Sequence, residues 1–186
     1  MNIQGKVVTL RAIEMEDLAL LHQWANEPEI WEGLGGWHFP YSSLSTENWI
    51  KNINNNDLKN QNFAIETPEH GLIGTINLVD IDWKNRNAFS GVSLGNKDTR
   101  GKGYALDAVM TIMRYAFDEL GLARLDSDMI STNKVSINFF QKRCGWEVEG
   151  IKKNWFFRKG KFHDKVVVGI TAERYKEFLT ENDYWR

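Results

Sequence analysis

The sequence predicts a mixed α/β fold built as one layered domain. Its hydrophobic patterns follow the order strand, two helices, three strands, helix, strand, helix and further strands, which favours helices packed on a sheet. The chain has 186 residues, the usual size of one domain, and 42% of them are hydrophobic, enough for a sizeable core. Because no repeat or linker interrupts these patterns, we expect a single domain over residues 1–186.

The first quarter of the chain predicts one strand and two helices. A run of aliphatic and β-branched residues marks a strand over Lys6–Ile13. Apolar residues at helical spacing mark a helix over Asp17–Asn26, and Pro28 is expected to end it. Ser45 is the expected N-cap of a second helix, after an irregular stretch over Glu29–Ser43.

The central part of the chain predicts an antiparallel meander of three strands. These strands are expected over Phe63–Thr67, Leu72–Ile81 and Ala88–Leu94. The two connections, Pro68–Gly71 and Trp83–Asn87, carry the polar residues, proline and glycine that turns use.

The C-terminal half alternates helices with strands. A Gly-rich loop leads into an amphipathic helix that begins near Ala105 and stops before Gly121. The elements after it are expected in the order strand, helix, two short strands, strand and helix, over Ala123–Ile130, Asn133–Lys142, Trp146–Val148, Asn154–Arg158, Val166–Ile170 and Glu173–Leu179.

Composition narrows the class of protein. With 23 basic against 25 acidic residues and no basic run that stands out, the sequence does not suggest a nucleic-acid partner. Its apolar stretches are far shorter than the roughly 20 residues of a membrane span, and the first residues lack a signal-peptide core. The single cysteine, Cys144, excludes an internal disulfide, so a cytoplasmic location is expected.

The loop Arg100–Ala105 has the features of a phosphate-binding turn. It precedes a helix, whose first N–H groups have no internal partner and whose N-terminus carries partial positive charge. Gly101 and Gly103 allow a ligand to approach the backbone, and Arg100 and Lys102 add charge. The loop matches neither the nucleoside-triphosphate motif nor the dinucleotide motif. A tight connection without a ligand is the alternative interpretation.

The segment Val92–Ala105 resembles the coenzyme A loop of the GCN5-related N-acetyltransferase (GNAT) family. That family pattern is Arg or Gln, two residues, Gly, one residue, Gly or Ala, and Arg100, Gly103 and Ala105 occupy its places. Further segments are similar to the subgroup that acetylates the amino termini of ribosomal proteins, namely Val8–Ile13, Asp17, Leu106–Ala108, Tyr115–Leu122, Asn133–Ser136, Glu149–Gly150, Gly160 and Asp164. The resemblance therefore covers nearly the whole chain.

The resemblance implies a GNAT fold, which is a single mixed, mostly antiparallel sheet with splayed central parallel strands and helices on both faces. The splayed strands would be Ala88–Leu94 and Ala123–Ile130, with the pantetheine arm of acetyl-CoA between them. The implied cofactor-binding residues are Val92, Ser93, Leu94, Arg100, Gly101, Lys102, Gly103, Tyr104, Ala105, Asn133 and Phe140. For Asn133 a helix cap is the alternative role, and for Phe140 a place in the core.

The implied reaction is direct attack of a primary amine on the thioester of acetyl-CoA. Many family members protonate the departing thiolate with a tyrosine, but Phe140 stands at that position here. The subgroup uses a serine three residues after the asparagine, which makes Ser136 the candidate catalytic residue. A first-turn serine satisfied by backbone is the alternative. One residue appears inserted within Lys142–Trp146 relative to the family, which leaves the register of Phe139 and Phe140 open.

The acceptor site is expected at the segment Trp31–Tyr41, which borders that site in the family. Its glycines allow movement, and its aromatic residues are suited to wall a pocket. We take Glu32, Trp37 and Tyr41 as candidate substrate-binding residues, with a plug of the core as the alternative. The resemblance identifies no base; by position the candidates are Glu32, Asp80 and Asp82, each with a solvated carboxylate as its alternative.

The acceptor itself stays open between a protein N-terminus and a small amine such as a polyamine, an amino sugar or an aminoglycoside. A catalytically silent acyl-CoA-binding module on the same fold is the alternative function, and a nucleotide-phosphate binder is a weaker third. His38 and His163 have no ligand-like partners nearby in sequence, so no metal site is expected. The oligomeric state is undetermined, with a homodimer among the alternatives.

Overall fold

The computed structural model describes residues 2–36, 38–53 and 57–186, and these contain an eight-stranded sheet in the order β1-β2-β3-β4-β5-β6-β8-β7. All neighbouring strands are antiparallel except β5 and β6. The strands are β1 (Ile3–Gln4), β2 (Thr9–Arg11), β3 (Gln61–Thr67), β4 (Gly71–Asp82), β5 (Asn87–Leu94), β6 (Arg124–Ile130), β7 (Glu147–Arg158) and β8 (Lys161–Thr171).

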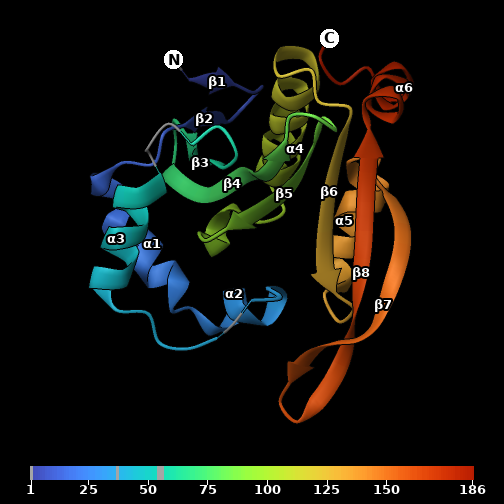
Figure 1. Cartoon of the computed structure of the whole chain (residues 1–186). Helices are drawn as coiled ribbons and strands as arrows, with labels where there is room; N and C mark the ends of the chain where they lie inside the picture. Colours follow the sequence, from blue (N-terminus) through green and yellow to red (C-terminus); the bar gives the residue numbers. More distant parts are fainter. Residues whose placement is uncertain (1, 37, 54–56) are drawn as a thin grey trace.

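Helices cover both faces of this sheet, as expected (Figure 1). The helices are α1 (Leu18–Ala25), α2 (Pro28–Gly33), α3 (Ser43–Ile53), α4 (Tyr104–Arg114), α5 (Lys134–Arg143) and α6 (Ala172–Asn182). Ala64 and Ile65 are neighbours on β3 and point to opposite faces. Ala64 packs in a small cluster with residues of α1 and α3, whereas Ile65 belongs to the large cluster that α4, α5 and α6 cover.

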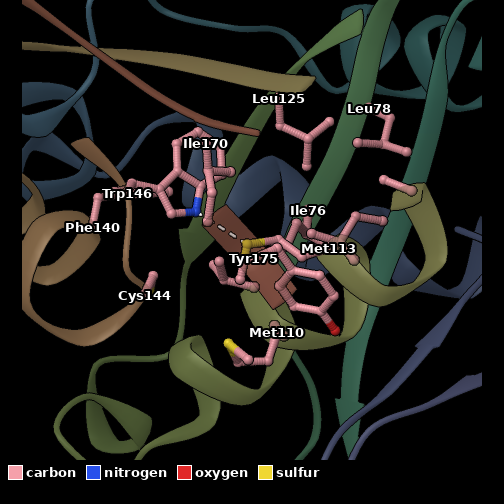
Figure 2. Close-up of a cluster of buried hydrophobic side chains, with 14 of the residues drawn as sticks. Ile76, Leu78, Met110, Met113, Leu125, Phe140, Cys144, Trp146, Ile170 and Tyr175 are labelled. Atoms are coloured by element: carbon pink, nitrogen blue, oxygen red, sulfur yellow. Dashed lines mark hydrogen bonds between the residues drawn. The ribbon is translucent and has the colours of Figure 1, made fainter. Parts of the chain in front are cut away.

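The large cluster is the main core of the protein. Figure 2 shows side chains of α4, such as Met110 and Met113, among residues of the central strands and of α6. The indole of Trp146 packs in the same cluster and donates its N–H to the sulfur of Met113 over 3.2 Å, so its one polar group is satisfied. Tyr175 from α6 is fully buried against Phe117, with ring centroids 5.2 Å apart. Fully burying such a side chain contributes roughly 1.5–3 kcal/mol.

Two expectations for the N-terminal segment were wrong. The stretch Glu29–Ser43, which was expected to be irregular, contains most of α2, and Pro28 is the first residue of this helix, where its fixed φ suits a helix start and its missing N–H costs nothing. The six residues of α2 are too few to show a helical period in sequence. Ser45 is not the cap of α3, because the Ser42 hydroxyl accepts the Ser45 N–H over 3.1 Å and so makes the N-cap bond.

The C-terminal strands are longer than their apolar patterns indicated. The two short strands expected around Gly150 form one strand, β7, which contains register shifts after Val148 and after Lys152. These irregularities break the alternation that sequence patterns depend on. Together with β8, this edge strand forms a hairpin that projects beyond the rest of the sheet, next to α2 (Figure 1).

Candidate active site

The central strands β5 and β6 diverge along their length. They pair in parallel at only three positions, Asn87–Phe89 with Arg124–Asp126. Beyond these positions β5 stays paired with β4, and β6 with β8, to their last residues (Figure 1). The sheet is therefore open between the carboxyl ends of two parallel strands. Val92, Ser93 and Leu94 border this wedge, where an extended ligand can add to the strand edge.

The Gly-rich loop at the end of β5 has the backbone that the sequence suggested. Gly101 and Gly103 have φ of +75° and +87°, which favour glycine, and a Cβ on either would meet nothing within 4 Å. Gly103 is the N-cap of α4 and offers no side chain to cap it. The first-turn N–H groups, including those of Tyr104 and Ala105, are thus left for an anion in front of the helix.

Ion pairs link this loop to α2. Lys97 lies 3.1 Å from carboxylate oxygens of both Glu27 and Glu29, and Arg100 lies 3.7 Å from Glu29. The side chains of Lys97 and Arg100 are 45% and 44% exposed, so these pairs are weak and exchangeable. Lys102 is exposed on the same loop. Lys97 and Arg100 can therefore bind a pyrophosphate, whose oxygens would replace the carboxylates of Glu27 and Glu29.

Asn133 uses both ends of its amide. Its oxygen accepts the N–H of Ser136 over 3.1 Å and caps α5, and its Nδ2 donates to the carbonyl of Gly33 over 3.1 Å. The helix-cap role is therefore present, and the bond to Gly33 adds a link from α5 to the end of α2. The predicted hydrogen bond from Asn133 to the cofactor stays a prediction.

Ser136 and Phe140 lie on α5 in different surroundings. Ser136 is half-buried in the first turn, and its hydroxyl has no hydrogen-bond partner among the described residues. The hydroxyl makes no hydrogen bond to the described backbone, whereas the alternative for this residue was a first-turn serine satisfied by backbone. Phe140 is 5% exposed and packs edge-on against Trp146 at 4.9 Å, within the core. A contact of Phe140 with the cofactor stays a prediction.

An inner cavity of about 410 Å³ lies between α1–α3 and the sheet. Thr75 and Ser93 form its sheet side, and the two residues stand opposite each other on β4 and β5. The other lining residues are mostly apolar or aromatic: Leu21, Trp24, Ala25, Ile30, Trp31, Leu34, Gly36, His38, Tyr41, Ser45, Thr46 and Trp49. The cavity thus reaches the wedge at Ser93, and no carboxylate is among the described residues that line it.

An outer cleft of about 670 Å³ lies between the loop after α2 and the β7–β8 hairpin. It is lined by Glu32, Gly35, Gly36, His38, Trp155, Phe156, Phe157, Arg158 and Lys159. Gly36 and His38 line both spaces, so the inner cavity and the outer cleft adjoin. Of the predicted acceptor residues, Tyr41 lies at the inner cavity and Glu32 at the outer cleft, while Trp37 lies outside the described residues.

Arg158 holds the loop between the two spaces. Its Nη2 donates to the carbonyls of Leu34 and Gly36 over 2.6 and 3.0 Å and lies 3.2 Å from Nε2 of His38. Burial and the charge of Arg158 lower the pKa of His38, so the imidazole is neutral near pH 7 and accepts from the guanidinium. Since this bond occupies its lone pair, His38 positions the loop rather than receiving a proton.

None of the three candidate bases, Glu32, Asp80 and Asp82, lies in an environment suited to a general base. Glu32 is exposed, and its hydrogen bond from Lys159 lowers the pKa of its carboxyl. Bonds from the N–H and side chain of Asn85 lower the pKa of Asp82 in the turn after β4. Along the strand, Asp80 lies roughly 13 Å and Asp82 roughly 20 Å from the level of Ser93. A general base at pH 7 needs the opposite shift and a place beside the amine.

Two parts of this site were not evident from the sequence. Trp24, Trp31 and Trp49 meet at the inner cavity, although they come from three separate helices. The segment Lys152–Lys165 contains six lysine and arginine residues and one aspartate, and aromatic residues interrupt this basic run. The described residues contain no His, Cys, Asp and Glu cluster able to hold a metal, and no helix long and apolar enough to cross a membrane.

Comparison with known proteins gives the family. The model of the acetyltransferase (GNAT) domain family matches residues 8–147. The SPbeta prophage-derived uncharacterized N-acetyltransferase YokL of Bacillus subtilis is 29% identical over 92% of this chain and 94% of its own length. The spermidine N(1)-acetyltransferase of Vibrio cholerae is 26% identical over 90% of this chain and 95% of its own length.

A solved structure agrees with this assignment. The crystal structure of spermidine N-acetyltransferase from Vibrio cholerae in complex with CoA and spermine aligns with a TM-score of 0.82 and 25% identity. The alignment covers 92% of this chain and 99% of that one. The fold class, the acetyl-CoA cofactor and acetyl transfer to an amine are confirmed, and the finer ribosomal subgroup stays a prediction. The chain belongs to the GNAT family of acetyltransferases.

Proposed function

We propose that the acetyl group is delivered at the wedge between β5 and β6 to a primary amine that enters through the inner cavity. The observation that carries this proposal is the meeting of the two spaces at Ser93, which borders the wedge and lines the cavity. Acetyl-CoA then lies on one side of β5 and the acceptor on the other, with the thioester between them.

The cofactor occupies three parts of the site in this proposal. Its pantetheine arm pairs with the backbone of Val92, Ser93 and Leu94, and its pyrophosphate sits at the N-terminus of α4 on the loop Arg100–Ala105. Lys97 and Arg100 exchange the carboxylates of Glu27 and Glu29 for phosphate oxygens, which also accept charge-assisted bonds. Asn133 and Phe140 contact the pantetheine side and the tail.

The reaction forms a carbon–nitrogen bond and breaks the carbon–sulfur bond of the thioester. A primary amine with a pKa near ~10 is mostly protonated at pH 7 and must lose a proton before attack. Because no carboxylate is among the described residues lining the inner cavity, a water relay takes this proton. Backbone N–H groups at the open edge of β5 polarise the carbonyl. The Ser136 hydroxyl protonates the departing thiolate and regains a proton, through water, from the nitrogen that has attacked, which leaves the neutral amide and free coenzyme A.

The finer properties rest on the composition of the sequence and on the resemblance. We expect a single acetyltransferase domain over residues 1–186, a cytoplasmic location, neither a nucleic-acid nor a membrane partner, and an acceptor set that includes protein N-termini. Spermidine N(1)-acetyltransferases among the relatives support polyamines among the acceptors to be tested. A homodimer is testable by light scattering of the purified chain.

An amine screen tests the proposed function. The purified chain is mixed with acetyl-CoA and a panel of peptides, polyamines, amino sugars and aminoglycosides, and released coenzyme A is measured with a thiol reagent. Acetylated product with at least one amine, verified by mass, is the expected result. Tight acetyl-CoA binding with no turnover across the panel identifies the silent acyl-CoA-binding module instead.

A further inference from the structure

The outer cleft is lined by two cations, Arg158 and Lys159, and by one carboxylate, Glu32. Arg158 has no carboxylate within ion-pair distance among the described residues, although it sits in the cleft wall. Its Nε–H is buried and has no hydrogen-bond partner in the same part of the chain. The side chain of Lys159, beside it, is 85% exposed, and its Nζ lies 2.6 Å from Oε1 of Glu32. Such an exposed pair contributes little and is readily exchanged.

The hairpin that forms this wall is basic and aromatic along its length. Between Lys152 and Lys165 it has six basic residues against one acidic residue, in a chain whose net charge is −2. Trp155, Phe157 and Phe162 are 52%, 61% and 61% exposed. Lys153 and Lys165 are paired with Asp164 and Asp128, but the hairpin keeps a surplus of cations beside exposed aromatic rings. Such a surface is suited to an extended ligand with negative charge.

The inner cavity and the outer cleft, where the acceptor is proposed to bind, offer no free carboxylate among the described residues for a polycation. The inner cavity has no carboxylate among its described lining residues. The three glutamates around α2 are already paired, Glu27 and Glu29 with the cofactor loop and Glu32 with Lys159. A polyamine entering by the outer cleft would pass two cations before it reached the thioester.

We infer that the acceptor of this enzyme carries an anionic group, a carboxylate or a phosphate, on the side away from its amine. The amine end enters the uncharged inner cavity, and the anion rests in the outer cleft against Arg158 and Lys159. Because the inner cavity and the outer cleft adjoin at Gly36 and His38, they form one continuous path for such a molecule. This inference rests on the proposed function and adds the class of acceptor to it.

Glu32 then has a definite role at the mouth of the cleft. It holds Lys159 when no acceptor is bound, and the acceptor's anion displaces it. Removal of the Glu32 charge therefore strengthens binding of an anionic acceptor. If the acceptor were a polycation, Glu32 would attract it and the same change would weaken binding, so the sign of the effect separates the two cases.

Matched acceptors test the inference on the wild-type enzyme. Glucosamine 6-phosphate is compared with glucosamine, and the tripeptide Ala-Ala-Glu with Ala-Ala-Gln amide, with spermidine as the polycation. We expect a higher kcat/KM for the anionic member of at least one pair, and a preference that shrinks as salt rises from 0.02 to ~0.5 M because added ions screen the attraction. A preference within the sugar pair indicates a small phosphate as the source, and one within the peptide pair an acidic polypeptide.

Two variants and a control complete the test. Lys159→Glu should lower the anionic-to-neutral ratio of kcat/KM roughly three- to tenfold, as expected for reversing one exposed charge, and Glu32→Gln should raise it. Lys176→Glu makes the same charge change on exposed α6, far from the cleft, and should leave the ratio unaltered (Figure 1). Preferred turnover of spermidine, with a higher KM in Glu32→Gln, overturns the inference but not the proposed function. No turnover with any amine overturns the proposed function itself.

Discussion

The hydroxyl of Tyr184 donates a 2.8 Å hydrogen bond to Oδ1 of Asp107, which joins the C-terminal segment to the first turn of α4. Asp107 is only 1% exposed. Its carboxylate also accepts the successive backbone N–H groups of Lys6, Val7 and Val8 over 2.7–3.0 Å. One buried carboxylate thus ties both ends of the chain to the helix that presents the cofactor loop.

Asp107→Asn should therefore cost more stability than Tyr184→Phe. The amide replaces an acceptor oxygen by a donor and leaves buried N–H groups unsatisfied, at roughly 2–4 kcal/mol, whereas loss of the hydroxyl removes one bond, at roughly 1–1.5 kcal/mol. Urea unfolding followed by circular dichroism measures both free energies. Equal losses in the two variants would contradict the idea that the backbone bonds dominate.

The pair of Arg11 and Asp17 predicts a pH dependence of stability. The guanidinium makes two bonds to the carboxylate, at 2.8 and 2.9 Å. Burial opposes the charged form, but the bonds from Arg11 and from the N–H of Glu14 outweigh it and lower the pKa of Asp17. A carboxyl with a lowered native pKa stabilises the fold above its unfolded pKa of about 3.9, and this stability disappears as pH falls through the native pKa.

We expect Asp17→Asn to lower the free energy of unfolding by roughly 1–3 kcal/mol at pH 7. The difference from wild type should shrink below about pH 4, since the wild-type carboxyl then becomes protonated as well. Urea unfolding at pH 7, 5 and 3 gives both quantities. Glu16→Gln, on an exposed neighbour of the same turn, is the control and should show little difference at any of the three values. A difference as large at pH 3 as at pH 7 would rule out the ion pair as its cause.

The cofactor loop gives a prediction at Gly103. Its φ of +87° strains any other residue by roughly 1–2 kcal/mol, while the space around it is open. Gly103→Glu should abolish acetyl-CoA binding, because it adds a side chain and negative charge where the pyrophosphate sits, and Gly103→Ala should weaken binding less. Calorimetric titration with acetyl-CoA measures both. Gly150→Ala, at an equally open glycine outside the loop, should bind normally. Unchanged affinity in Gly103→Glu would remove the pyrophosphate from this loop.

Local patterns were sufficient for much of the fold and for the cofactor half of the site. The strand alternation, the amphipathic α4 and the glycines before it depend on residues close in sequence. The resemblance to the GNAT family then predicted how these elements are placed in the fold. The acceptor half depends on contacts between distant segments. Arg158 meets Leu34 and Gly36 more than 120 positions away, and no local pattern reports such a bond. The short α2 and the shifted register of β7 were missed because neither keeps a regular period.

The hydroxyl of Ser136 provides the sharpest test of the chemistry. It lies one turn into α5, half-buried and without a protein partner in the described part of the chain, so it is free to donate to the leaving thiolate. Ser136→Ala should lower kcat by roughly 10²-fold, the lower range for loss of general acid catalysis, and should leave the Kd of acetyl-CoA nearly unchanged. Ser136→Thr keeps a hydroxyl and should recover part of the activity. Steady-state kinetics and calorimetry separate the two effects. Turnover near the wild-type level in Ser136→Ala would show that water, rather than this serine, protonates the thiolate.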